Sequence, residues 1–128
     1  MRQGLVDTSA FVSAVEGEIE AAALPEESMI SIVTVCELNH GVLAASERRR
    51  PLRLRALNFA QHEFDALPID YLVAVHYGEL KANARRRHKA RPDPADTLIA
   101  ATAMAHGLPV ITRDKDFKVF DGVEVVFV

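Results

Sequence analysis

The feature that most constrains the fold is the alternation of short apolar runs with longer segments of helical spacing. The apolar runs lie at residues 4–7, 28–33, 66–69, 109–112 and 123–128. Short apolar strands that alternate with helices are typical of a parallel sheet that is covered on both faces. We therefore predict one α/β domain over residues 1–128, an α/β/α sandwich with a parallel sheet of four or five strands.

Capping patterns indicate where two of the central helices begin. Thr34 followed by Glu37 is the capping-box pattern, so a helix is predicted to start there and to run over residues 34–46. Residues 47–64 have apolar residues at helical spacing with arginines between them, and they are predicted to form the next helix.

The last two helices carry clearer boundary signals. Asp70 is the predicted N-cap of a helix over residues 71–87. Asp93 followed by Pro94 is typical of an N-cap with proline at the first helical position, and Gly107 is the predicted C-terminal end of that helix.

Composition narrows the class of protein. The chain has 128 residues, a net charge of −3 and one cysteine, Cys36. A single cysteine excludes an internal disulfide framework and fits a reducing compartment. No stretch has the length of a signal peptide's apolar region or of a membrane span. We therefore expect a cytoplasmic protein that does not associate with membranes.

Four acidic residues stand at the positions where a parallel α/β sheet places its functional site. In such folds the site lies outside the carboxyl ends of the strands. Asp7 ends the first predicted strand, and Asp114 lies two residues beyond the strand at 109–112. Glu37 and Asp96 lie in the first turns of predicted helices. We expect these carboxylates to meet at one edge of the sheet.

Each acid also has a structural explanation when it is considered alone. Glu37 completes a capping box, the helix dipole favours Asp96, and Asp114 and Asp116 suit a turn. Together they are harder to explain, because converging carboxylates repel one another unless a cation neutralises them. Oxygen ligands without cysteine or paired histidine favour Mg²⁺ or Mn²⁺ over zinc. Such cations hold a phosphate and activate a water in two-metal nucleases.

Three stretches of the chain are together similar to one known family. They are DTSAF (7–11), TVCELNHG (34–41) and PADTLIAATAMAHGLPVITRDKDF (94–117). In this combination the chain resembles the PIN-domain ribonucleases, specifically the VapC-type toxins of bacterial VapBC toxin–antitoxin pairs. The resemblance extends from Asp7 to the last predicted strand, and the third stretch is its most specific part.

The resemblance implies site residues, position by position. The implied catalytic acids and metal ligands are Asp7, Glu37, Asp96 and Asp114, with Asp116 as an outer ligand. The implied supporting hydroxyls, which orient metal, water or carboxylate, are those of Thr8, Ser9 and Thr112.

The resemblance also implies an activity and partners. It implies an endoribonuclease that depends on Mg²⁺, or alternatively Mn²⁺, and cuts tRNA or rRNA to inhibit translation. A VapB-type antitoxin would neutralise it by laying its C-terminal segment across the active-site groove. VapC-type toxins are generally homodimers, so we expect one here, with Leu43 and Leu57 as candidate contact residues.

Two basic tracts, residues 48–55 and 85–91, are either solvated helix faces or contacts for RNA phosphates. The second tract leads directly into the segment that carries Asp93 and Asp96, which favours it as the RNA-binding one. Its predicted RNA-binding residues are Arg85, Arg86, Arg87, Lys89 and Arg91.

Other classes of protein fit the sequence less well. A non-catalytic PIN-like module that binds protein or RNA is the main alternative, and the complete set of acids speaks against it. A haloacid-dehalogenase-like phosphatase needs a second aspartate where this chain has Ser9. A receiver domain needs an acid pair near the N-terminus, whereas the first predicted strand of this chain carries one acid, Asp7. Glu37 and His40 form one Glu-x-x-His motif, whereas a di-iron site needs two.

Overall fold

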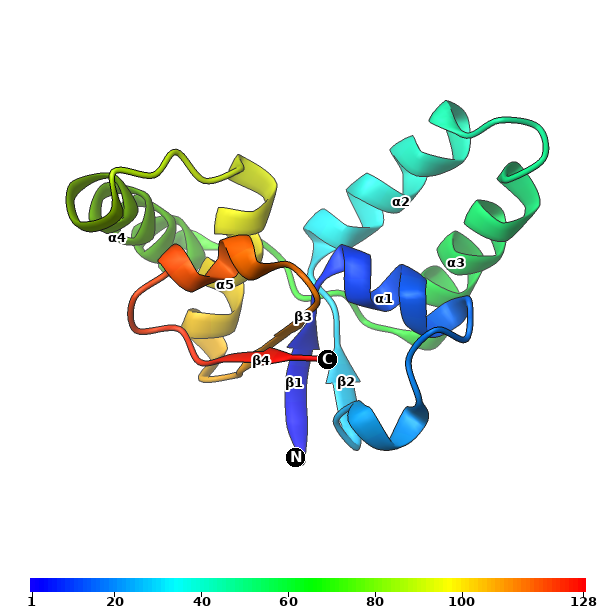
Figure 1. Ribbon diagram of the computed structural model, residues 1–128, viewed down its shortest axis with the longest axis horizontal. Coiled ribbons are helices and arrows are strands. Elements are labelled where there is room, and N and C mark those ends of the chain that lie inside the picture. Colours follow the sequence, from blue (N-terminus) through cyan, green and yellow to red (C-terminus); the bar gives the residue numbers. More distant parts are fainter.

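A four-stranded parallel sheet forms the centre of the protein (Figure 1). The computed structural model describes residues 1–128. The strands are arranged in the order β2-β1-β3-β4, and every neighbouring pair is parallel. They are β1 (Gln3–Val6), β2 (Glu27–Met29), β3 (Val110–Thr112) and β4 (Val125–Phe127). The predicted parallel α/β fold is confirmed, with four strands.

Five α-helices cover the two faces of the sheet. The helices α1, α2 and α3 lie on one side, and α4 and α5 lie on the other (Figure 1). The α2–α3 pair and the α4–α5 pair diverge from the carboxyl edge of the sheet as two arms. The α-helices are α1 (Thr8–Val15), α2 (Ile32–Ala44), α3 (Arg50–Glu63), α4 (Tyr71–His88) and α5 (Pro94–His106), and the 3₁₀ helices are η1 (Ala21–Ala23) and η2 (Lys115–Val119).

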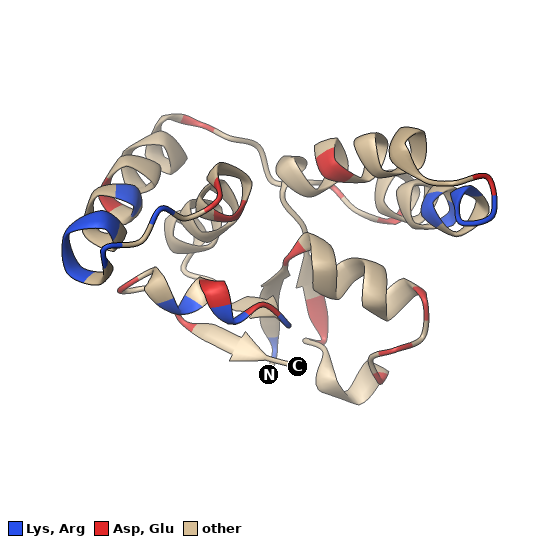
Figure 2. Ribbon diagram, turned by 45° about the horizontal axis from the view of Figure 1, so that its top comes forward, with Lys and Arg blue, Asp and Glu red and all other residues tan.

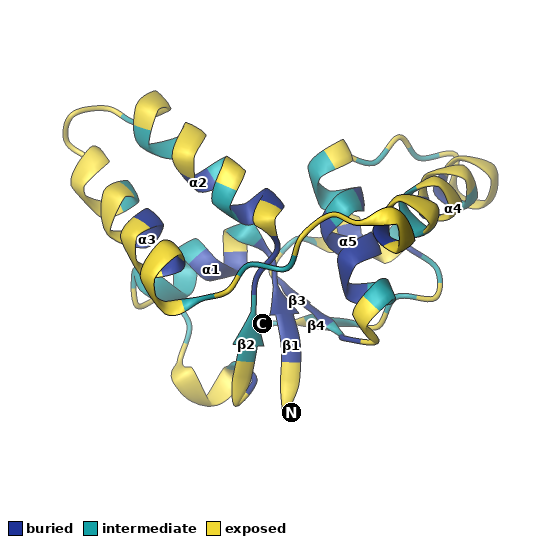
Figure 3. Cartoon of the chain, turned by 180° about the vertical axis from the view of Figure 1, so that it is seen from behind, coloured by how far each residue is buried: buried dark blue, intermediate teal, exposed yellow.

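Alternating side chains of the two central strands fill two separate apolar clusters. Leu5 and Val110 belong to the cluster beneath α4 and α5. Val6 and Ile111, their neighbours in sequence, belong to the cluster beneath α1, α2 and α3. Successive residues of a strand point to opposite faces, so a strand buried on both faces must be apolar throughout. Figure 3 shows this burial concentrated on the central strands and on the inner side of α5.

Gly4 allows β1 to pack closely against its surroundings. A Cβ atom at this position would lie 2.8 Å from Cγ of Pro25 and 2.9 Å from the side chain of Ile111. Real Cβ atoms do not approach neighbours this closely, so only glycine fits without displacing the core.

The prediction that Thr34 caps the second helix is wrong. Helix α2 begins at Ile32, and Ser31 is its N-cap, with its Oγ accepting from the N–H of Val33 at 3.0 Å. Thr34 is fully buried, and its hydroxyl lies 3.0 Å from that of Thr8. Both serine and threonine make good caps. The early end of β2 decides between them, because it frees the chain to turn at Ser31.

The fifth strand proposed at residues 66–69 is not formed. Only a single bridge pairs Leu67 with Ser31, alongside the end of β2. The strands predicted at 28–33 and 123–128 are also shorter in the structure, at Glu27–Met29 and Val125–Phe127.

The boundaries of the last two helices are confirmed. Asp70 accepts from the N–H of Val73 at 3.0 Å, and Asp93 accepts from the N–H of Ala95 at 2.8 Å. Gly107 ends α5 in the left-handed conformation, with a φ of 64°. Among these helices, none combines the length and the apolar composition that crossing a bilayer would require.

Candidate active site

The order of the strands creates a switch point between β1 and β3. From β1 the chain crosses to β2 on one side, and β3 and β4 later add on the other side. Neighbouring loops diverge at such a point and leave a crevice at the carboxyl ends of the strands. Asp7 directly follows β1, and Asp114 lies two residues after Thr112, the last residue of β3. These two acids therefore flank the switch point.

The four acids predicted from the sequence line one pocket at this edge, with a volume of about 410 Å³. Asp7 and Asp114 come from the strand ends, whereas Glu37 and Asp96 come from α2 and α5. The volume lies in the range of ligand sites in proteins. The other lining residues are Thr8, Ser9, Val12, Ser13, Glu16 and Arg53.

Asp7 is buried and held by several donors. The Thr112 hydroxyl donates to its Oδ2 at 2.6 Å, and the N–H of Ala10 donates to its Oδ1 at 2.9 Å. The Ser9 hydroxyl lies 3.2 Å from both oxygens. Burial raises the pKa of Asp7 above its usual value, against the lowering effect of these donors, and the charge of Asp114 adds to the rise. The carboxylate is thus fixed in orientation and favours a nearby cation.

Glu37 is held by a relay of two hydroxyl groups. Thr8 Oγ1 donates to Glu37 Oε1 at 2.6 Å, and the Thr34 hydroxyl lies 3.0 Å from Thr8 Oγ1. Because Thr8 donates to Glu37, the Thr34 hydroxyl is the donor to Thr8. Sequence reasoning had placed Thr34 in a helix cap and so missed its contact with the site.

Burial and the negative charges of the other three acids contribute to a raised pKa of Asp96. Burial is the largest cause that raises its pKa to about 7, followed by the charge of Asp93 and then by the charges of Asp114, Asp7 and Glu37. Carboxylates whose charges raise the pKa of a neighbouring acid form an electrostatically coupled site, and such sites are enriched in functional residues.

Asp114 and Asp116 have different surroundings. Asp114 donates its N–H to Thr112 Oγ1 at 2.9 Å, and its Oδ1 accepts from the N–H of Asp116 at 2.9 Å. Asp116 itself lines a neighbouring pocket of about 230 Å³, which Asp96 also lines. The structure therefore places Asp116 beside the acid pocket and not in its wall.

The ligand atoms that the pocket offers fit a cation that prefers oxygen ligands, such as Mg²⁺. The acids and hydroxyls supply only oxygen, and the pKa values of Asp7 and Asp96 are raised. No three histidine, cysteine, aspartate or glutamate side chains are close enough, as they stand, to hold a metal ion together. Mutual repulsion keeps carboxylates apart until a cation offsets it, so a bound ion would have to draw them closer.

The second basic tract lies mostly away from the acids. Figure 2 shows basic residues gathered at the outer ends of the two helical arms. The arginines at the end of α4 are exposed, and Arg87 lies 3.7 Å from Asp121. Lys89 follows α4 in the left-handed conformation. Arg91 is the one basic residue of this tract that lines a pocket together with Asp96.

Two charged residues of the acid pocket were missed by sequence reasoning, as were the lining residues Val12 and Ser13. Glu16, just after α1, and Arg53, on α3, both line the pocket. Glu16 resembles any charged residue at the end of a surface helix, and no sequence signal marks it. Arg53 belongs to the basic tract at 48–55, whose pattern does not show which arginine turns inward.

The fold and the pocket define an α/β protein with an acidic site at the switch point of a parallel sheet. Residues 4–123 match the family described as PIN domain. The chain belongs to the PIN domain family, as the sequence motifs predicted.

Known relatives cover nearly the whole chain. Ribonuclease VapC5 of Mycobacterium tuberculosis is 35% identical, over 96% of this chain and 91% of the relative. Ribonuclease VapC4 of the same organism is 33% identical, over 98% of this chain and 97% of the relative. A crystal structure of VapBC-5, from the VapBC family of toxin–antitoxin systems of that organism, has a TM-score of 0.83 and 32% identity, with coverage of 100% of this chain and 98% of that one.

Proposed function

We propose that this protein is a metal-dependent endoribonuclease toxin that cleaves structured RNA, either tRNA or rRNA, and so inhibits translation. One observation carries the proposal: four carboxylates line a single pocket at the switch point of a PIN-domain fold. Relatives that match nearly the full length of the chain are named ribonucleases, which supports the same activity.

Asp7 and Asp96 are the central residues of the proposed site. One ends β1 and the other lies in the first turn of α5, so rigid elements hold both. When bound there, Mg²⁺ or Mn²⁺ would lower the pKa of a water and offset charge on the phosphate in the transition state. Glu37 and Asp114 would complete the set of oxygen ligands, with Asp116 acting from outside it.

The hydroxyls give the acids their orientation. Thr112 and Ser9 hold Asp7, and Thr8 holds Glu37, each by the hydrogen bonds described above. Groups that hold a ligand in place contribute to metal affinity and activity about 10- to 100-fold in known metal sites. We propose this supporting role for all three hydroxyls.

We further propose a VapB-type antitoxin as partner and a homodimer as the assembled toxin, in a cytoplasmic setting. The structure of the similar VapBC-5 protein supports the first part. Of the candidate contact residues, Leu43 is 81% exposed and available for a partner. Leu57 is 8% exposed and packs in the core beneath α3, so it is not a contact residue.

Cleavage of total RNA tests the proposal. The purified chain is incubated with total bacterial RNA in Mg²⁺ or in EDTA, and new 5′ ends are mapped by sequencing. We expect a small number of discrete sites in tRNA or rRNA, formed in Mg²⁺ and absent in EDTA. A folded protein that binds RNA and forms no new ends in either Mg²⁺ or Mn²⁺ would instead be a non-catalytic binding module.

A further inference from the structure

The acid pocket has one basic residue on its wall. Arg53, on α3, lines the pocket together with five carboxylates, those of Asp7, Glu16, Glu37, Asp96 and Asp114. Its side chain is only 30% exposed. A phosphate group that enters this pocket meets mostly negative charge, and Arg53 is the only basic residue that lines it.

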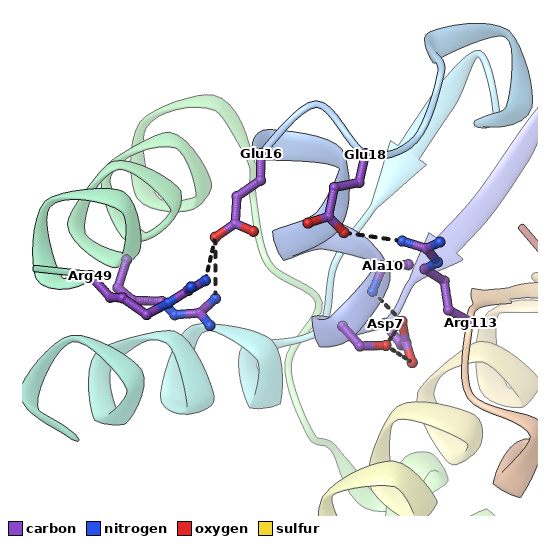
Figure 4. A network of polar contacts seen from close by, with 8 residues as sticks. Asp7, Ala10, Glu16, Glu18, Arg49 and Arg113 are labelled. Carbon is purple, nitrogen blue, oxygen red and sulfur yellow. Dashed lines mark hydrogen bonds and ion pairs between the residues drawn. The ribbon is translucent and has the colours of Figure 1, made fainter. Parts of the chain in front are cut away.

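Glu16 keeps Arg53 at this position. Glu16 Oε1 is buried and accepts no hydrogen bond. It lies 3.6 Å from Nη1 of Arg53. It also lies 3.7 Å from Nη2 of Arg49, one helical turn earlier, and Figure 4 shows this contact between Glu16 and Arg49. A buried carboxylate is destabilising unless positive charge compensates it. The two arginines supply that charge, and in return Glu16 restricts where the Arg53 guanidinium lies.

The guanidinium of Arg53 has free donors. At 3.6 Å its contact with Glu16 is longer than a hydrogen bond. No guanidinium N–H of Arg53 donates a hydrogen bond to another protein atom, in contrast to Arg50. Arg50 on the same helix differs, because its Nε and Nη2 donate to the carbonyl oxygens of Val42 and Ala45 at 3.2 and 2.9 Å. Arg50 therefore joins α3 to α2, whereas the donors of Arg53 remain available to a ligand.

We infer that Arg53 binds a non-bridging oxygen of the RNA phosphate in the acid pocket, and that Glu16 is the residue that positions it. The inference rests on the proposed function. A guanidinium pairs with phosphate through parallel N–H donors, which fixes orientation as well as charge. Donors fixed in place before reaction stabilise the charge of the transition state without reorganisation.

Arg53 could alternatively serve only as a counter-charge that holds the folded acids together. That role makes a different prediction. Removal of Arg53 would then lower thermal stability and leave the salt dependence of RNA binding unchanged, because no phosphate contact would be lost.

Arg49 provides a matched control. It contacts the same oxygen of Glu16 at nearly the same distance, but it does not line the acid pocket. The variants are Arg53→Ala, Arg53→Lys and Arg49→Ala, and the probe is the shortest RNA that contains a mapped cleavage site. We expect Arg53→Ala to lower kcat/KM in Mg²⁺ about 100-fold, Arg53→Lys to recover about a tenth of full activity, and Arg49→Ala to stay within about threefold.

RNA affinity provides a second measurement. A loss of folding stability alone would not change the salt dependence of this affinity. Each variant is combined with Asp7→Asn to block cleavage, and affinity for the same RNA is measured by fluorescence anisotropy over a range of salt. Arg53→Ala should reduce the slope of log affinity against log salt by about 0.7 to 0.9, the value for one phosphate contact. Arg49→Ala should leave that slope unchanged.

Glu16 is tested through its coupling to Arg53. Glu16→Gln alone should lower kcat/KM by about tenfold, and the double variant Glu16→Gln, Arg53→Ala should be no worse than Arg53→Ala alone. Equal kcat/KM and equal salt slopes for Arg53→Ala and Arg49→Ala would overturn the inference while leaving the proposed ribonuclease activity intact. A parent protein that cleaves no RNA would overturn both.

Discussion

The hydroxyl of Thr112 donates to Oδ2 of Asp7 at 2.6 Å, across a separation of 105 residues. The Oγ1 atom of Thr112 in turn accepts from the N–H of Asp114 at 2.9 Å. One buried hydroxyl at the end of β3 therefore holds the acid that follows β1 and also the acid that follows β3 itself. This hydroxyl therefore links the two acids that flank the switch point.

Thr112→Val should reveal this role, because valine keeps the shape of threonine and removes the hydroxyl. We expect RNA cleavage to fall about 10- to 100-fold. Unfolding free energy should fall by only about 1–2 kcal/mol. Thr102→Val is the control: Thr102 is equally buried, but its hydroxyl donates to the carbonyl of Leu98 within α5. Equal activity losses in the two variants would show that Thr112 has no special connection to the site.

Asp7→Asn should separate folding from activity. Asparagine keeps the size of the side chain and caps a helix about as well as aspartate, so α1 should still form. Because burial raises the pKa of Asp7, removal of its charge should leave metal-free stability unchanged or higher. Cleavage should fall by roughly a thousandfold or more. The control is Asp65→Asn, an exposed residue outside the pocket, where cleavage at the parent rate is expected. Thermal melts in EDTA and cleavage assays in Mg²⁺ measure the two effects, and near-parent cleavage by Asp7→Asn would refute the proposed metal site.

Asp96 should make metal-free stability depend on pH. Its folded pKa of about 7 lies above the unfolded value of about 3.9. The folded state therefore binds the proton more tightly, and stability in EDTA should decrease as the pH rises from about 4 to 7. Asp96→Asn should remove most of this decrease and stabilise the metal-free protein at pH 7.5 by roughly 1–2 kcal/mol, since the residue is only half-buried.

The control for Asp96 is Glu63→Gln, at the exposed end of α3, which should leave the pH profile unchanged. Melting temperatures at several pH values between 4.5 and 8 in EDTA give the profiles. Parallel profiles for the parent and Asp96→Asn would show that Asp96 does not retain its proton in the folded protein.

Gly4→Ala should destabilise the fold without touching the site. A Cβ atom would overlap Pro25 and Ile111 at 2.8 and 2.9 Å, and overpacking of this kind costs about 1–3 kcal/mol. Gly78→Ala is the control, because Gly78 lies within α4 with nothing within 4 Å of an added Cβ. Alanine should stabilise that helix by roughly 0.5–1 kcal/mol. Chemical denaturation measures both changes in unfolding free energy. A Gly4→Ala variant as stable as the parent would show that the sheet can shift to accommodate the added Cβ atom.

Much of the architecture followed from short-range signals. The caps at Asp70 and Asp93 and the end of α5 at Gly107 were predicted correctly, because a capping hydrogen bond joins residues two or three positions apart. The common position of Asp7 and Asp114 followed from the parallel-sheet rule alone, since Asp7 comes directly after β1 and Asp114 lies two residues after β3.

Other features depend on which elements become neighbours, and only the tertiary structure decided them. Ser31 and Thr34 are equally suitable caps, and the end of β2 selected the first, which left Thr34 free to donate to Thr8. Glu16 and Arg53 are far apart in sequence and meet because α1 and α3 pack on the same face of the sheet. Periodicity and capping patterns describe one segment at a time, whereas these contacts arise from the order of the strands and the packing of helices across them.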